Sequence, residues 1–271
     1  MTAQHKVLFV GCGNMGAALA SGYARHHPAA DIRAIDHDPE RATGLLTEEA
    51  KTRISIVGTV GELGNFQPDM VVLALKPQAL KTALADLIPV CAKALVVSIA
   101  AGTCLTQLQA LLGDHRRIIR AMPNLPVVVG AGASALFAPA SAASDLDMAC
   151  ALFASVGTVE RVTSEEQIDA ATALAGSGPA YFFAFVEQLA LSGMAIGLPQ
   201  DLAERLARQT CIGAAALLSQ DKRSASELKA AVCSPKGTTE AGLAAMQNTL
   251  ASAADEAVSA AHRRARELAA D

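Results

Sequence analysis

The chain has 271 residues, with 22 Lys and Arg against 26 Asp and Glu, which gives a formal net charge of −4. That balance provides no broad basic surface, so we expect no nucleic-acid partner. The apolar fraction of 52% argues against disorder, and an aromatic fraction of 3% without Trp favours helices on buried parallel strands over an aromatic-rich β-sandwich. The length is sufficient for two domains.

Short apolar runs alternate with helix-like segments through the first 160 residues. Such runs are typical of a parallel sheet covered by helices on both faces. The six predicted strands are Lys6–Val10, Ile32–Ile35, Ile54–Val57, Met70–Leu75, Leu95–Ile99 and Ile118–Ala121, and two more, Ser134–Phe137 and Thr158–Val162, are predicted at the sheet margin.

The segment Gly11-Cys12-Gly13-Asn14-Met15-Gly16 follows the first predicted strand and opens the first predicted helix. In this context GxGxxG predicts a dinucleotide site. Gly11 permits a tight turn, Gly13 lets a pyrophosphate approach the backbone, and Gly16 lets helix and strand pack closely. The N-terminus of the helix adds amide groups and a partial positive charge. We therefore expect these six residues to bind NADH or NADPH.

Asp36 ends the second predicted strand, 25 positions after Gly11. A carboxylate there is expected to bond the adenosine ribose and to repel a 2′-phosphate, which favours NADH slightly. The nearby basic side chains leave NADPH open, and Asp38 before Pro39 is also a natural helix cap. Those basic residues are Arg33, His37 and Arg41.

Three further clusters fall where predicted strands end or helices begin, the usual place for ligands of open α/β sheets. They are Ala74-Leu75-Lys76-Pro77-Gln78, Ser98-Ile99-Ala100-Ala101-Gly102 and Arg120-Ala121-Met122-Pro123-Asn124-Leu125-Pro126. Each taken singly is compatible with an ordinary turn.

From Ser164 onward only helical patterns continue, over residues 164–175, 178–196, 200–219, 224–231, 238–247 and 249–269. We predict a Rossmann-type, doubly wound α/β domain over residues 1–162 that binds the dinucleotide. An all-α domain is predicted over residues 163–271.

Other features point away from metal and membrane chemistry. The six cysteines form no CxxC pair and the histidines no HExxH motif, so we expect reduced, mostly buried thiols and no metal site. Tyr181–Leu198 is apolar but interrupted by Glu187 and Gln188, which predicts a buried helix and no membrane partner. Only Val7 to Val10 separate Lys6 from the first glycine, too few for a secretory signal, so we expect a cytoplasmic protein.

Two later segments add to the glycine loop and the three clusters. They are Ala173-Leu174-Ala175-Gly176-Ser177-Gly178-Pro179-Ala180-Tyr181 and Ser234-Pro235-Lys236-Gly237-Thr238-Thr239-Glu240-Ala241-Gly242-Leu243. With these segments, the chain resembles the pyrroline-5-carboxylate reductase family over essentially its whole length. The resemblance implies that the cyclic imine 1-pyrroline-5-carboxylate, a small imino acid, is reduced to L-proline by hydride from NAD(P)H, the last step of proline biosynthesis.

The resemblance also implies roles for single residues. Ser234, Gly237 and Thr238 would hold the substrate carboxylate, and Thr239, the catalytic candidate, would meet the ring nitrogen. The other matched positions would line the cofactor, and they are Leu75, Lys76, Pro77, Ala100, Ala101, Gly102 and Asn124. Taken without the resemblance, SPKGTT is also a helix cap and Lys76 a solvated lysine.

One position departs from the family pattern, because Lys236 stands where a small residue, commonly Gly, is usual. If that position needs a positive φ, Lys costs about 1 kcal/mol relative to Gly. The loop geometry and substrate affinity are therefore open at this point.

Two alternatives compete with this interpretation. A related imine reductase or β-hydroxyacid dehydrogenase shares the arrangement, but the latter uses a lysine on the first long helix after the nucleotide domain, and no Lys occurs between Lys93 and Lys222. A non-catalytic nucleotide-binding regulator is the second alternative. The residues that would bind substrate, still present here, speak against it.

The helical half also predicts self-association. Phe182–Gly197 and Leu202–Leu218 carry apolar residues on more than one face, more than a peripheral monomeric domain buries. We expect a homodimer through these helices. The resemblance implies the same, with rings of dimers in some members.

Overall fold

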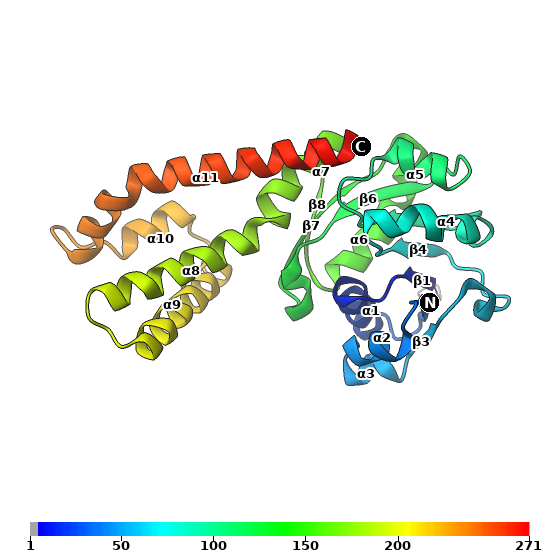
Figure 1. Ribbon diagram of the computed structural model, residues 1–271, viewed down its shortest axis with the longest axis horizontal. Coiled ribbons are helices and arrows are strands. Elements are labelled where there is room, and N and C mark those ends of the chain that lie inside the picture. The colour runs from blue at the N-terminus through cyan, green and yellow to red at the C-terminus, as the bar shows by residue number, and fades with distance from the viewer. Residues whose placement is uncertain (1–4, 271) are drawn as a thin grey trace. The chain divides into compact units, whose positions relative to one another are not determined.

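The computed structural model describes residues 5–270 (Figure 1). The chain divides into two compact units. The first comprises the residues up to Ser177 together with those from Ala261 onward, and the second is Gly178–Ala260.

The first unit contains one eight-stranded sheet with the order β3-β2-β1-β4-β5-β6-β7-β8. Neighbouring strands are parallel except β6 and β7, which are antiparallel. All eight predicted strands are confirmed, two with the predicted ends and six with one or both ends shifted by one or two residues. They are β1 Lys6–Val10, β2 Asp31–Ile35, β3 Ile54–Val57, β4 Met70–Leu73, β5 Leu95–Ser98, β6 Ile118–Met122, β7 Gly132–Phe137 and β8 Gly157–Arg161.

Helices cover both faces of this sheet, because the inner strands are apolar on both sides. Val7 and Phe9 of β1 belong to one core cluster, whereas Leu8 and Val10 belong to the other. The first cluster includes residues of α1 Asn14–His26 and α6 Leu146–Ala154, and the second includes residues of α4 Pro77–Cys91 and α5 Leu105–Leu111. The expected doubly wound α/β fold is confirmed.

Shorter elements complete the first unit. They are α2 Pro39–Leu45, α3 Glu48–Lys51, α7 Glu165–Ala171, the 3₁₀ turns Val60–Leu63, Leu125–Val129 and Ala140–Asp145, and a π-helical segment Thr172–Gly176. The helix predicted over 164–175 is thus α7 followed by a π turn. Such π segments are frequent at functional sites.

The second unit is helical, as predicted, with α8 Gly178–Ala195, α9 Gln200–Gln220, α10 Ala225–Ala231 and the first part of α11 Thr238–Ala270. The break predicted between residues 247 and 249 is wrong, since α11 is one helix of 33 residues (Figure 1). Asn248 and Thr249 are good capping residues, but no Gly or Pro follows to interrupt the backbone hydrogen bonds, so the helix continues.

Helix α8 is less buried than the sequence predicts. It packs on α9, yet only Gly178 and Ala190 of its residues are buried, and the side chains of Phe182 and Phe183 are 67% and 62% exposed. The prediction of a buried helix is therefore wrong for a single chain. No helix among residues 5–270 combines the length and apolar character needed to cross a membrane.

All six cysteines are free thiols. Only Cys12 and Cys91 are fully buried, and the other four are half-buried, so the thiols are less enclosed than predicted.

Candidate active site

The glycine loop lies at the carboxyl end of β1, where the sheet order reverses between β1 and β4. Ligands of open α/β sheets bind at this switch point. Gly11 has a φ of 88°, and a Cβ placed on it would lie 2.6 Å from the carbonyl oxygen of Ala74, the residue after β4. A Cβ on Gly16 would overlap the carbonyl oxygen of Gly11. Both positions thus require glycine for close packing of the loop itself.

Gly13 differs from these two glycines. A Cβ there would have no heavy atom within 4 Å, so the space above Gly13 is open. Gly13 is also the N-cap of the 13-residue helix α1, whose first turn holds no acidic side chain and which has no side-chain cap. Open space over uncapped amides at the positive end of a helix fits a pyrophosphate.

Asp36 is buried immediately after β2, where its carboxylate bonds the loop. Its Oδ2 accepts a hydrogen bond from the Cys12 amide at 2.8 Å, and its Oδ1 accepts one from the Asp38 amide at 3.1 Å. His37 Nδ1 lies 3.1 Å from the same Oδ1. Asp36 thus fixes the glycine loop against the end of β2. Burial, together with this negative charge, raises the pKa of the Cys12 thiol to about 12.

Arg33 and Arg41, two of the basic residues near Asp36, have different hydrogen-bond partners. Arg33 Nη1 donates to the Leu63 carbonyl at 3.1 Å, and its guanidinium lies 4.3 Å from the centre of the Phe66 ring. The Asp38 carboxylate accepts from the Arg41 amide at 3.1 Å and so caps α2. The capping alternative for Asp38 is therefore correct.

The second cluster, Leu75 to Pro77, leads from β4 into α4. The amide of Ala74 donates to the Val10 carbonyl at 2.8 Å, which holds the start of this turn beside the glycine loop. Lys76 is the exposed N-cap residue of α4, and Pro77 is the first helical residue. Proline suits that position because its missing N–H has no partner there in any helix.

The third cluster follows β5, and its glycine has a packing reason. Gly102 has a φ of 69°, and a Cβ on it would lie 2.7 Å from Cβ of Leu268 near the end of α11. The Ser98 hydroxyl accepts from the Ala100 amide at 3.3 Å. Ala100 is buried, whereas Ala101 and Gly102 are half-buried.

Asn124 follows β6 and is almost fully buried. Its Nδ2 donates to the Ala175 carbonyl of the π-helical segment at 3.1 Å, and its Oδ1 accepts from the Ala133 amide at 2.9 Å. The side-chain amide therefore joins three segments of the first unit.

Sequence reasoning missed a buried ion cluster beside these loops. Arg120 in β6 is 3% exposed; its Nη1 lies 2.7 Å from Glu165 Oε1 and its Nη2 lies 3.7 Å from Asp169 Oδ1. The pKa of Asp169 is raised, mainly by burial. The negative charge of Glu165 adds to this rise, and the positive charge of Arg120 opposes it. The available signal was an arginine inside an apolar strand, with two carboxylates four positions apart on one helix face.

The SPKGTT turn lies in the second unit, between α10 and α11. The Gly237 amide donates to the Ser234 carbonyl at 2.9 Å, and a Cβ on Gly237 would overlap the Ser234 hydroxyl. Exposed Thr238 and Thr239 are the first two residues of α11. The N-terminus of so long a helix favours a carboxylate ligand.

Lys236 adopts a left-handed conformation in this turn, with a φ of 58°. Its amide donates to Glu240 Oε2 at 2.5 Å. The position therefore needs a positive φ, and the strain foreseen for Lys in place of Gly is present.

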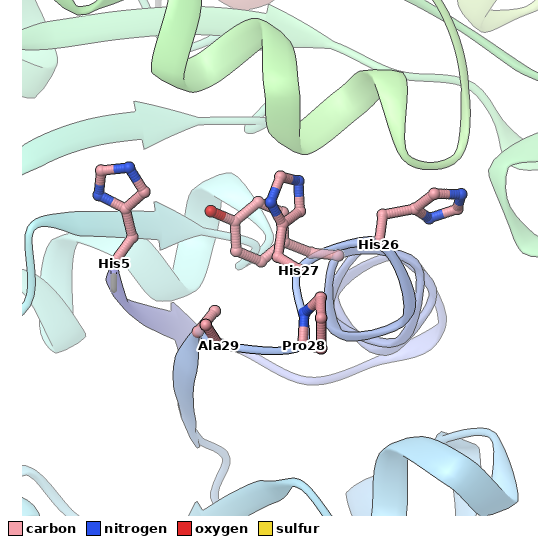
Figure 2. Close-up of a pocket in the computed structure, with 7 residues that line it drawn as sticks. His5, His26, His27, Pro28 and Ala29 are labelled. Atoms are coloured by element: carbon pink, nitrogen blue, oxygen red, sulfur yellow. The ribbon is translucent and has the colours of Figure 1, made fainter. Parts of the chain in front are cut away.

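A pocket found in the first unit lies at the other end of β1 and is not the dinucleotide site. His5 precedes β1 and His27 follows α1, and Figure 2 shows His26 projecting away from both other imidazoles. His27 stacks on Tyr23 with ring centres 4.1 Å apart, and burial lowers its pKa. Within residues 5–270, no group of three or more His, Cys, Asp or Glu is arranged to hold a metal ion.

Two family models match the chain. Residues 165–268 match pyrroline-5-carboxylate reductase dimerisation, and residues 6–102 match NADP oxidoreductase, coenzyme F420-dependent.

Whole-length relatives give the same result. The chain is 40% identical to pyrroline-5-carboxylate reductase of Pseudomonas aeruginosa over 97% of both sequences. It is similar to the solved pyrroline-5-carboxylate reductase of Coxiella burnetii, with 32% identity and a TM-score of 0.88 over 98% of this chain and 99% of that one. The Plasmodium falciparum pyrroline carboxylate reductase, solved with NADP bound, is 27% identical, with a TM-score of 0.78 over 98% of each chain. The chain belongs to the pyrroline-5-carboxylate reductase family.

Proposed function

We propose that the chain reduces 1-pyrroline-5-carboxylate to L-proline with NAD(P)H. The observation that carries this proposal is the Ser234–Thr239 turn at the start of α11, in a chain that also keeps an open Gly13 at the switch point of its sheet. The first feature suits a carboxylate-bearing imine and the second suits a dinucleotide.

Residues of the first unit would bind the cofactor, which when bound supplies the hydride for the C=N carbon. The amides at Gly13 and the start of α1 would hold the pyrophosphate, and the cluster residues after β4, β5 and β6 would line the nicotinamide. Those cluster residues are Leu75, Lys76, Pro77, Ala100, Ala101, Gly102 and Asn124. The uncapped amides at the start of α1 support this assignment.

We further propose a preference for NADH over NADPH. Asp36 would place a carboxylate near the adenosine ribose, where a 2′-phosphate is repelled. The Arg33 guanidinium, held against Phe66 and the Leu63 carbonyl, is engaged elsewhere. The NADP bound to the Plasmodium falciparum relative makes the ratio of the two cofactors a direct test.

The substrate would bind at the turn. The Thr238 amide and the Ser234 hydroxyl, in the turn that Gly237 shapes, would hold the carboxylate, and Thr239 would bond the ring nitrogen. A hydroxyl donates to a neutral imine or accepts from an iminium, so Thr239 can orient the ring in either protonation state. Because Thr239 is exposed, it can give its proton to the nitrogen while it takes another from solvent water. The rest of the rate comes from aligning the imine carbon with the nicotinamide.

The functional division we propose is a dinucleotide-binding domain over residues 1–162 and a substrate-binding and dimerisation domain over residues 163–271. The family-model match over residues 165–268 supports the second range. We propose a homodimer through this part of the chain, with rings of dimers as a further assembly, working in the cytoplasm. The exposed apolar side chains of α8 support the dimer.

The test is turnover of purified protein with 1-pyrroline-5-carboxylate and reduced cofactor, with proline identified by chromatography. We expect one proline molecule to form for each molecule of cofactor oxidised. We expect no cofactor oxidation when the substrate is replaced by the β-keto acid that a β-hydroxyacid dehydrogenase would reduce. Cofactor binding without proline formation would contradict the proposal and favour a non-catalytic regulator.

A further inference from the structure

We propose that Glu165 is a positioning residue for the nicotinamide, acting through the two loops that follow β5 and β6. This inference rests on the proposed function, because it assigns Glu165 to alignment of the hydride donor. Glu165 itself is expected to touch neither cofactor nor substrate.

One carboxylate oxygen of Glu165 accepts hydrogen bonds from two different segments. Glu165 Oε1 accepts a hydrogen bond from the Leu105 amide at 2.7 Å and another from Arg120 Nη1 at 2.7 Å. Arg120 is almost fully buried, and the Glu165 side chain is 27% exposed. Hydrogen bonds to charged partners in such surroundings are strong and directional.

The two donors belong to two different loops of the proposed nicotinamide side. Leu105 is the first residue of α5, directly after the turn that contains Ala100 and Gly102. Arg120 lies in β6, four residues before Asn124. Glu165 thus holds the end of one loop and the strand before the other at a fixed separation.

A second contact, made by Leu268, also holds the first of these loops. Gly102 packs so closely on Leu268 that a Cβ would lie 2.7 Å from the leucine Cβ. The turn is therefore held by two contacts, the packing of Gly102 on Leu268 and the hydrogen bond from the Leu105 amide to Glu165. Removing the carboxylate therefore removes one of these two constraints.

Asp169 cannot replace Glu165 in this role. Its Oδ1 lies 3.7 Å from Arg120 Nη2 and so supplies a second negative charge, whereas Glu165 accepts the hydrogen bond that the Leu105 amide donates. A glutamine at position 165 keeps an oxygen that can accept from both donors. An alanine keeps none, and an aspartate keeps the charge but is too short.

The experiment compares Glu165→Ala, Glu165→Gln and wild type, with Glu166→Ala as the matched control on the exposed side of the same helix turn. Steady-state kinetics give kcat and the KM for 1-pyrroline-5-carboxylate, and deuterated cofactor gives the isotope effect on hydride transfer. The fluorescence of bound NADPH reports the nicotinamide surroundings without turnover.

For Glu165→Ala we expect kcat to fall about tenfold to hundredfold with KM changed less than about threefold, because a small misalignment costs rate more than binding. The isotope effect rises and the bound NADPH fluorescence shifts. Glu165→Gln and Glu166→Ala stay within about threefold of wild type. If Glu165→Ala does not fold, Glu165→Asp replaces it, with the same fall in kcat expected.

An unchanged kcat and unchanged NADPH fluorescence in Glu165→Ala or Glu165→Asp would overturn the proposal, as would an equal loss in Glu165→Gln. A wild-type protein that forms no proline would instead contradict the proposed function. In that case the NADPH fluorescence of the variants still decides the positioning role.

Discussion

Individual residues of the glycine loop divide between holding the fold and leaving room for a ligand. Gly11 and Gly16 are required by backbone that is already present, since a side chain on either would meet a carbonyl oxygen of the chain itself. Gly13 faces open space. These surroundings agree with the separate roles that the motif predicts, a tight turn at Gly11, open space at Gly13 and close packing at Gly16.

Gly13→Ala and Gly16→Ala test this division. Gly13 has a φ of −70°, which alanine adopts freely. We therefore expect the free energy of unfolding of the Gly13→Ala variant to stay within about 0.5 kcal/mol of wild type. Its Kd for reduced cofactor should rise at least about tenfold, because the Cβ occupies the pyrophosphate approach. Gly16→Ala should lose about 1–3 kcal/mol of stability from overlap with backbone.

Urea unfolding and cofactor titration of the two variants give both quantities. Unchanged cofactor affinity in Gly13→Ala would show that the dinucleotide does not approach the chain there.

Asp169 provides a pH-dependent prediction at the same scale. Burial is the main cause of its raised pKa, with Glu165 adding to it and Arg120 and His262 opposing it. The folded state therefore binds a proton more readily than the unfolded chain, so this group's contribution to stability falls as pH rises through the acid range. Asp169→Asn removes the titration.

We expect the free energy of unfolding of Asp169→Asn, relative to wild type, to increase from a pH just below the ordinary Asp pKa of 3.8 to neutral pH. Urea titrations at the two pH values measure it. A relative stability that decreases with pH would mean that Arg120 outweighs burial and that the carboxylate is stabilised by the fold.

At the scale of elements, the predicted strands were correct where the signal was local. Runs such as Met70–Leu73 and Leu95–Ser98 are apolar on both faces, and this pattern alone indicates a central parallel strand. The antiparallel pairing of β7 with β6 depends on contacts between distant residues and was not predictable. The unbroken course of α11 has a local cause, because no Gly or Pro follows the capping residues Asn248 and Thr249.

The candidate site shows the same limit. The glycine loop and the SPKGTT turn are continuous in sequence, so their local geometry could be predicted from residue types. Glu165 acts on Leu105 and Arg120 across 60 and 45 positions, and Asn124 reaches Ala175 across 51. A local sequence pattern does not identify hydrogen-bond partners that lie so far apart in the chain.

Lys236 in the turn before α11 gives a prediction that separates strain from charge. Lys236→Gly and Lys236→Ala both remove the ammonium, but only glycine accepts a φ of 58° without a steric cost. We expect the glycine variant to be more stable than the alanine variant by about 1 kcal/mol. Thermal or urea unfolding of the pair measures this difference, and equal stabilities would show that the turn relaxes around alanine.

At the scale of the whole molecule, the helical unit exposes apolar residues that contact with another subunit would bury. The Phe182 and Phe183 side chains are more than half exposed, and Ile196 is 84% exposed. Such a surface is typical of an interface between subunits. The family-model match to a dimerisation region covers the same helices.

We expect light scattering at micromolar concentration to give twice the mass of one chain, or a whole multiple of that mass where dimers form rings. A double variant, Phe182→Glu with Phe183→Glu, should shift the mass toward one chain because buried carboxylates disfavour the interface. Leu45→Glu in α2 is the matched control, since Leu45 is an exposed apolar residue of the first unit. A double variant that keeps the dimer mass would place the interface elsewhere.

The central claim is that this chain reduces 1-pyrroline-5-carboxylate with Thr239 at the ring nitrogen. The most direct measurement is the oxidation of NADH and of NADPH with that substrate by wild type, Thr239→Ala and Thr239→Ser. We predict wild-type turnover with the higher kcat/KM for NADH, about a hundredfold loss of kcat/KM in Thr239→Ala, and retention of most activity in Thr239→Ser, which keeps the hydroxyl. Absence of wild-type turnover, or full activity in Thr239→Ala, would contradict the account.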